Sequence, residues 1–94
     1  MSTFHHIEKE EINSLHFVSY DVLDNIDQKQ QRKLDLEKAM VLGNGDHGKA
    51  KIVFTTESGP REVETTVWAT TDETVTLKGG VTIPIHCIQQ VNFV

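Results

Sequence analysis

The C-terminal half of the chain, from residue 49 to residue 94, alternates short apolar and polar segments with turn residues. Apolar side chains recur at every second position, as at Ile52 and Phe54, which is the period of a half-buried strand. Five short strands in so little sequence favour a small, strongly bent SH3-like β-barrel. The candidate strands are residues 50–54, 63–69, 75–77, 81–85 and 91–93, and the expected core residues are Ile52, Phe54, Val75, Leu77, Ile83 and Ile85.

The preceding part of the chain, residues 7–42, is predicted to be mainly helical. Residues 28–38 are strong helix formers without glycine or proline, and Asp27 followed by Gln30 matches a capping box. We expect a helix here with Leu34 on its buried side, and a loop over the glycine-rich residues 43–48. The pattern leaves open whether residues 36–42 continue the helix or become extended.

Residues 1–6 are expected to be disordered, as chain ends often are. Apolar residues at helical spacing, from Leu15 and Val18 to Ile26, suggest a further helix within residues 7–26. With 94 residues, the chain suffices for one domain with one modest core. Residues 1–94 are therefore predicted to form a single α+β domain, with an N-terminal helical part packed on a five-stranded SH3-like barrel.

The sequence favours a cytoplasmic location. The apolar runs are only a few residues long, so no membrane-spanning helix is expected. The first ten residues lack a basic region followed by an apolar stretch, so no secretory signal is expected. The single cysteine, Cys87, excludes an internal disulfide and suits a reducing compartment.

The net charge of -5 disfavours a general affinity for nucleic acids, which depends on Lys and Arg displacing counterions from phosphates. The net charge would not exclude RNA binding if the basic residues were gathered on one face, away from the acidic ones. An RNA-binding barrel should gather its bases on one face, and the candidates are Lys29, Arg32, Lys33, Lys49 and Lys51.

No metal, cofactor or catalytic site is expected. The chain has five histidines but no Cys-x-x-Cys or His-x-x-x-His pair, and on a strand His86 and Cys87 would point to opposite faces. Cys87 lies beside Ile88 and suits a buried core thiol better than a nucleophile. Glu62 and Glu64 share one strand face without a cleft between them, and we expect both to be solvated. The chain is therefore predicted not to be an enzyme.

Several segments resemble a group of uncharacterised short bacterial proteins, and the likeness extends over residues 34–94. The segments that carry it are residues 51–54, 62–69, 77–80 and 83–85. The resemblance implies a small-barrel fold and no particular activity. More remotely, the layout is similar to Sm-like RNA-binding barrels and to the small Rho-inhibitor barrel. Residues 69–74 depart from the Asp-x-Φ-x-Asn pattern of the Sm-like RNA-contacting loop, which argues against that mode of binding.

Two features point to a binding surface. Strand alternation places Trp68 opposite the inward-facing Val67, either exposed as an anchor for a partner or, as we favour, covered by the N-terminal helix. The last strand, residues 90–94, has no charged side chain to protect its edge. We predict a small cytoplasmic binding or adaptor protein acting through protein contacts, including contacts with a second copy. RNA binding by an Sm-like layout is the alternative.

Overall fold

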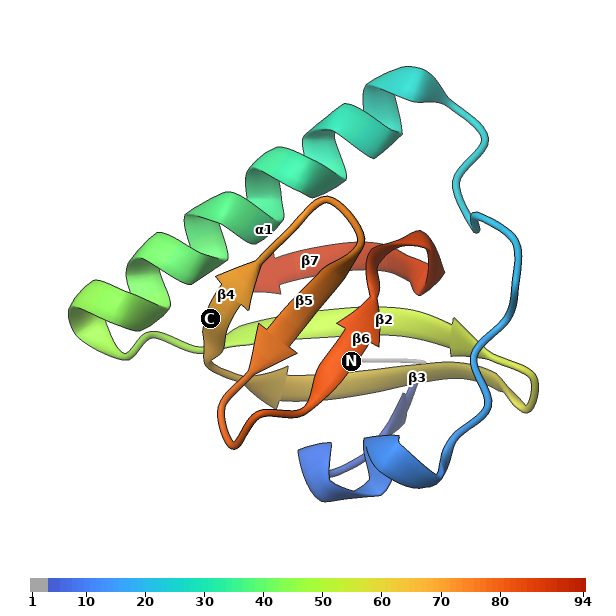
Figure 1. Cartoon of the computed structure of the whole chain (residues 1–94), viewed down its shortest axis with the longest axis horizontal. Helices are drawn as coiled ribbons and strands as arrows, with labels where there is room; N and C mark the ends of the chain where they lie inside the picture. The colour runs from blue at the N-terminus through green and yellow to red at the C-terminus, as the bar shows by residue number, and fades with distance from the viewer. Residues whose placement is uncertain (1–3) are drawn as a thin grey trace.

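The computed structural model describes residues 4–94 and combines one long helix with two small sheets (Figure 1). This confirms the α+β class. The elements are, in chain order, β1 (His5–His6), η1 (Lys9–Ser14), α1 (Ile26–Asp46), β2 (Ala50–Thr56), β3 (Gly59–Thr65), β4 (Val67–Thr70), β5 (Thr74–Leu77), β6 (Thr82–Pro84), η2 (Ile85–Cys87) and β7 (Ile88–Phe93). Among these elements, no helix combines the length and the hydropathy that crossing a membrane requires.

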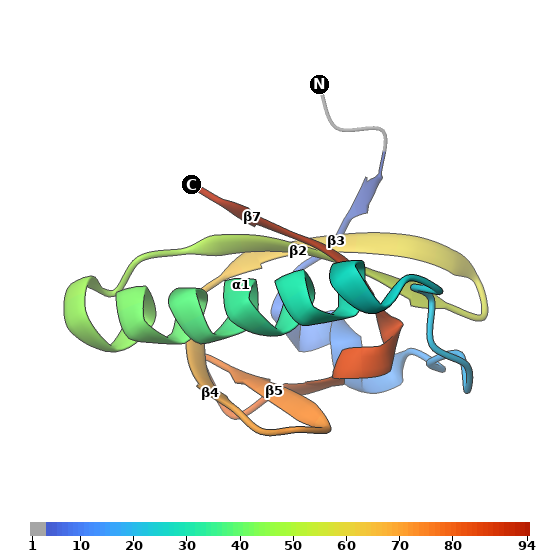
Figure 2. The ribbon, with the colours of Figure 1, turned by 90° about the horizontal axis from the view of Figure 1, so that it is seen from above.

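The strands form two separate sheets rather than a closed barrel. One sheet has the order β1-β3-β2-β7 and the other the order β4-β5-β6. Figure 2 shows them as two layers, with α1 along the open side between them. The predicted strand 63–69 is divided at Thr66 into β3 and β4, so that one bent segment supplies both layers. The expectation of a barrel closed by strand pairing is not met in the described chain, because α1 packs against β4 and β7 where closure would occur.

The core lies between the two sheets and the helix. Alternation places one face of each strand inward, as the sequence pattern predicts. Of the six expected core residues, five have no exposed surface, namely Ile52, Phe54, Val75, Leu77 and Ile83. Ile85 differs, because it begins η2 rather than continuing β6, and it is only partly buried. The turn after β5 uses Gly79 and Gly80 at φ +90° and +87°, a region that favours glycine.

Helix α1 is longer than the sequence pattern indicated. It begins at Ile26 because Asn25, not Asp27, is the N-cap, and the Asn25 side chain accepts hydrogen bonds from the Asp27 and Gln28 amides. At the other end it extends into the predicted loop and ends at Asp46, where the C-cap His47 is left-handed at φ 55°. Residues 36–42 are therefore helical, and the glycine-rich segment 43–46 is its last turn.

The buried face of α1 also differs from the expectation. It consists of Arg32, Leu36, Ala39 and Gly43, whereas Leu34 is 58% exposed. The physical reason is close packing. Gly43 lies so near the β4 backbone that a Cβ atom at this position would stand 2.3 Å from the Val67 carbonyl oxygen. This contact sets the rotation of the helix and turns Leu34 outward.

The segment before α1 is mostly not helical. Among its described residues the only helix is the short 3-10 helix η1, and residues 15–25 run across the molecule without helical structure. The predicted disorder of residues 1–6 is also incorrect for β1, which pairs in parallel with β3 through Arg61 and Glu62. Residues 1–3 lie outside the described chain. Long-range contacts replace the helix: Ile12 is fully buried, and the Val22 amide donates to the His86 carbonyl.

Candidate functional site

The predicted basic residues do not gather on one face. Lys29, Arg32 and Lys33 lie in the first half of α1. Lys49 and Lys51 lie beyond the other end of the helix, at the start of β2. About 20 Å of helix separates Lys33 from the C-terminal end of α1, at about 1.5 Å per residue.

Two of the candidate bases, Lys33 and Lys51, lie next to acidic residues. Lys33 Nζ is 3.8 Å from Asp72 Oδ1, and Lys51 stands opposite Glu64 in the β2–β3 register. Of the five candidates, Lys29 and Lys49 have no acid paired to them by an ion pair or by strand register in the described chain. The five candidate bases, all within the described chain, therefore do not form one continuous basic surface that could follow a phosphate backbone.

Arg32 is a buried structural residue, not a surface base. Its side chain is 8% exposed and forms a bidentate pair with Asp21, with Nη1–Oδ1 at 3.0 Å and Nη2–Oδ2 at 2.9 Å. Nη1 also donates to the Ile88 carbonyl at 3.0 Å. The hydrogen bond from Arg32 holds the pKa of Asp21 below its usual value, assisted by the Leu23 amide and the charge of Lys29. These bonds join α1 to residues 15–25, here called the crossing segment, and to Ile88, the first residue of β7.

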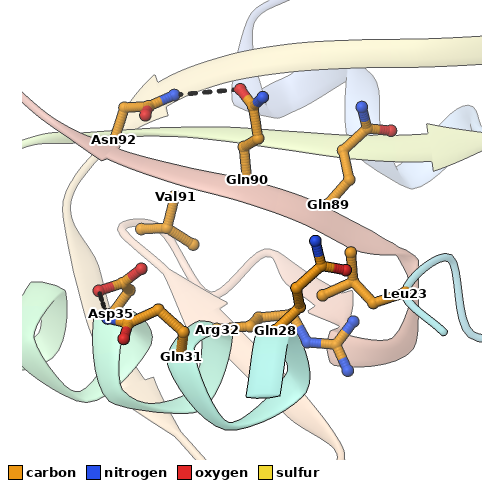
Figure 3. A pocket seen from close by; sticks show the side chains of 9 residues that line it. All are labelled: Leu23, Gln28, Gln31, Arg32, Asp35, Gln89, Gln90, Val91 and Asn92. Carbon is orange, nitrogen blue, oxygen red and sulfur yellow. Dashed lines mark hydrogen bonds between the residues drawn. The ribbon is translucent and has the colours of Figure 1, made fainter. Parts of the chain in front are cut away.

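A groove runs between α1 and β7, next to this arginine. It has a volume of about 290 Å³, and Figure 3 shows the side chains that line it. In the described chain β7 is the last strand of its sheet and pairs only with β2, so its other edge borders the groove. The groove is lined by Leu23, Gln28, Gln31, Arg32, Asp35, Gln89, Gln90, Val91 and Asn92.

The groove is apolar at its floor and amide-rich around it. In Figure 3 the Val91 side chain points from β7 toward α1, whereas Gln90 and Asn92 point the other way. Gln28 and Gln31 face the groove from the helix, and side-chain amides both donate and accept hydrogen bonds. An extended peptide offers alternating donors and acceptors on its backbone. The lining is therefore chemically suited to an added strand.

The sequence predicted the β7 side of this groove but not the α1 side. The unprotected edge of the last strand was expected, and β7 does end its sheet. The helix wall was missed, although Gln28, Gln31 and Asp35 recur at i, i+3 and i+7 and so share one side of α1. That spacing, beside the buried stripe of the helix, was the available signal.

Trp68 lies on β4, outside this groove, and is 47% exposed. The inward direction of Val67 is confirmed, since Val67 is 1% exposed. The covering of the indole by the helix is not found. Gly43 of α1 approaches the β4 backbone at Val67 instead, which leaves nearly half of Trp68 in contact with solvent.

His86 and Cys87 lie on η2, not on a strand, so their side chains do not point to opposite faces as expected. His86 Nε2 donates to the Val18 carbonyl at 2.8 Å, and the Cys87 thiol donates to the same oxygen at 3.3 Å. Burial raises the pKa of the Cys87 thiol. Cys87 is fully buried in the core and holds the crossing segment in place.

Glu62 differs from its prediction as a solvated acid. It is 6% exposed, and its Oε1 lies 3.6 Å from His6 Nδ1 on the neighbouring strand β1. Glu64 is only partly exposed. Within residues 4–94, no three His, Cys, Asp or Glu side chains come together in a way that could hold a metal ion.

The α1–β7 groove is therefore the candidate functional site, because it combines an apolar floor, side-chain amides and the edge of β7. Comparisons of the chain with family models, with curated proteins and with solved structures give no match.

Proposed function

We propose that this chain is a non-enzymatic cytoplasmic binding module that takes an extended segment of a partner protein as an additional strand on β7. The observation that carries the proposal is the edge of β7 beside the α1–β7 groove. The edge of a terminal strand presents a row of backbone amides and carbonyls that another chain can pair with. Strand addition next to a helix is a recurring mode of peptide recognition, in which the backbone supplies affinity and pockets supply specificity.

The side chains of β7 support this use of the edge. Its sequence, from Ile88 to Phe93, has no charged residue, so nothing on the strand repels an incoming chain. A second copy of the protein is the other occupant of this edge that the sequence suggests. We favour a single extended segment, because α1 lies beside the edge in each copy and two paired β7 strands would bring both helices face to face.

RNA binding is the weaker proposal. Its support would be a basic face, and the five candidate bases are divided between the two ends of α1, with Arg32 buried against Asp21. The net charge of -5 adds a general repulsion of phosphates.

The relationship to SH3-like small barrels is also a proposal. It is supported by the bend between β3 and β4 and by the 3-10 turn η2 that leads into the last strand. In this view α1 fills the side that strand pairing would otherwise close.

The binding function can be tested with a library of displayed peptides of about seven residues, near the length of an ordinary strand. Peptides enriched on the immobilised protein are titrated into ¹⁵N-labelled protein and followed by NMR. We expect amide shifts along β7 and along the wall of α1 that carries Gln28 and Gln31. Gln31→Arg should weaken binding at least about tenfold, because a longer charged side chain enters the groove.

The matched control is Gln30→Arg, which adds the same side chain to the neighbouring exposed position outside the groove. It should bind as the unaltered protein does. Equal loss in both variants, or shifts confined to Trp68 and β4, would contradict binding at β7. A single-stranded RNA titrated in parallel should leave the β7 amides unchanged at physiological salt.

A further inference from the structure

We propose that the added segment carries a lysine or arginine that pairs with Asp35, and an apolar residue two positions away that packs on Val91. This inference rests on the proposed function and names the class of peptide that the groove selects. Its basis is the carboxylate of Asp35 on the helix wall of the groove, which no described residue neutralises. The directions of Lys38, Arg32 and Val91 support it.

Asp35 is half-buried on the groove side of α1. Its Oδ1 accepts a hydrogen bond of 2.9 Å from Gln31 Nε2, one helical turn earlier, which holds the carboxylate in place. Among residues 4–94, no lysine, arginine or histidine nitrogen lies within ion-pair distance of this carboxylate. A fixed, partly desolvated carboxylate without a counter-charge favours a cationic ligand group.

The nearest cations of α1 are directed elsewhere. Lys38 follows Asp35 by three positions, a spacing that permits an ion pair on a helix. Its ammonium instead lies over the Phe93 ring, 4.8 Å from the centroid. Arg32 is neutralised by Asp21. The groove therefore presents a net negative charge at Asp35.

The position of the apolar residue follows from strand geometry. Side chains at alternate positions of a strand share one face. On β7 the face toward α1 is that of Val91, which is half-buried and packs against the core. An added strand in the same sheet places one side chain beside Val91, and the next on that face, two residues away, lies along the helix wall that carries Asp35.

The test uses capped peptides that contain valine and lysine two positions apart, Ser-Thr-Val-Thr-Lys-Thr-Ser and Ser-Thr-Lys-Thr-Val-Thr-Ser, so that both strand directions are sampled. Matched peptides replace the lysine with glutamine or glutamate. Titrated into ¹⁵N-labelled protein, one lysine peptide should bind about threefold to tenfold more tightly than its glutamine counterpart, and the glutamate peptide more weakly still. Asp35→Asn should remove this order, and added salt should reduce it.

Glu37→Gln is the matched control, because it removes one negative charge from an exposed position of the same helix outside the groove. It should preserve the order of affinities. Equal affinity of the three peptides, with shifts along β7, would overturn the role of Asp35 and leave strand addition standing. Binding by library-selected peptides without any by the lysine peptides would also overturn the inference. If neither set shifts β7, the proposed function itself fails.

Discussion

Replacing Arg32 with methionine should lower the free energy of unfolding by about 3 kcal/mol, near the low end of the range for breaking a buried ion pair. Methionine keeps the apolar contacts of the side chain but removes its charge and its donors. Asp21 then loses its bidentate partner, and the Ile88 carbonyl loses a hydrogen bond of 3.0 Å. The value lies at the low end because Asp21 keeps 28% of its side-chain surface exposed and is partly rehydrated. Denaturant unfolding at neutral pH measures it.

A double-mutant cycle separates the pair from its surroundings. Asp21→Asn should also destabilise the protein, since it leaves a buried guanidinium without a counter-charge. The double variant should regain much of the combined loss, because replacing both members of a buried pair is often nearly neutral. If Arg32→Met costs less than about 0.5 kcal/mol, the size of an ordinary surface substitution, the buried pair does not form in solution.

The same pair predicts a pH dependence. The pKa of Asp21 is held below its ordinary value of 3.8, first by its hydrogen bond from Arg32. The folded state therefore binds this proton less readily than the unfolded state does. The contribution of Asp21 is complete above the ordinary pKa and is lost as the pH falls through the lower pKa of the folded protein. Across that acidic interval the stability of Asp21→Asn should fall less steeply than that of the unaltered protein, and parallel profiles would contradict the assignment.

Arg32 also shows why the candidate site was only partly predictable. An arginine among Lys29 and Lys33 in the sequence resembles a surface base, because charged residues are rarely buried. Its partners, Asp21 and Ile88, lie 11 and 56 positions away, and only the folded chain brings them together. The spacing of Arg32 to Leu36 and Ala39 follows a helix face, so its burial was readable once the face was known. The sequence did not show that Asp21 is the acid that pairs with Arg32.

The fold, too, was predictable from the sequence only in part. The strands after residue 49 were predictable because alternation is a local signal, and five of the six expected core residues are fully buried. The segment before α1 was not, because helical spacing at Leu15 and Val18 occurs there without a helix. Its structure depends on distant contacts, such as the bond of His86 to the Val18 carbonyl. Trp68 and Leu34 were misassigned together, since both depend on how α1 is rotated.

Gly43→Ala should destabilise the protein by about 1–3 kcal/mol, the usual cost of forcing extra volume into a packed interface. Alanine is intrinsically the better helix former, by about 1 kcal/mol, so propensity alone predicts the opposite sign. At Gly43, however, the added Cβ would stand 2.3 Å from the Val67 carbonyl oxygen and 2.9 Å from Thr66 Cγ2. The carbonyl belongs to the β4 backbone and cannot rotate away, so α1 must move.

Gly45→Ala is the matched control, because it makes the same change two residues later in α1, where a Cβ meets nothing within 4 Å. It should leave stability unchanged or raise it by up to about 1 kcal/mol. Thermal and denaturant unfolding of the two variants measure the difference, which isolates the contact between α1 and β4 from helix propensity. Because α1 also forms one wall of the α1–β7 groove, Gly43→Ala should shift the amides of Gln28 and Gln31 as well, whereas Gly45→Ala should not. Equal stability of the two variants would mean that α1 does not sit against β4 as described, and the groove would then have no fixed wall.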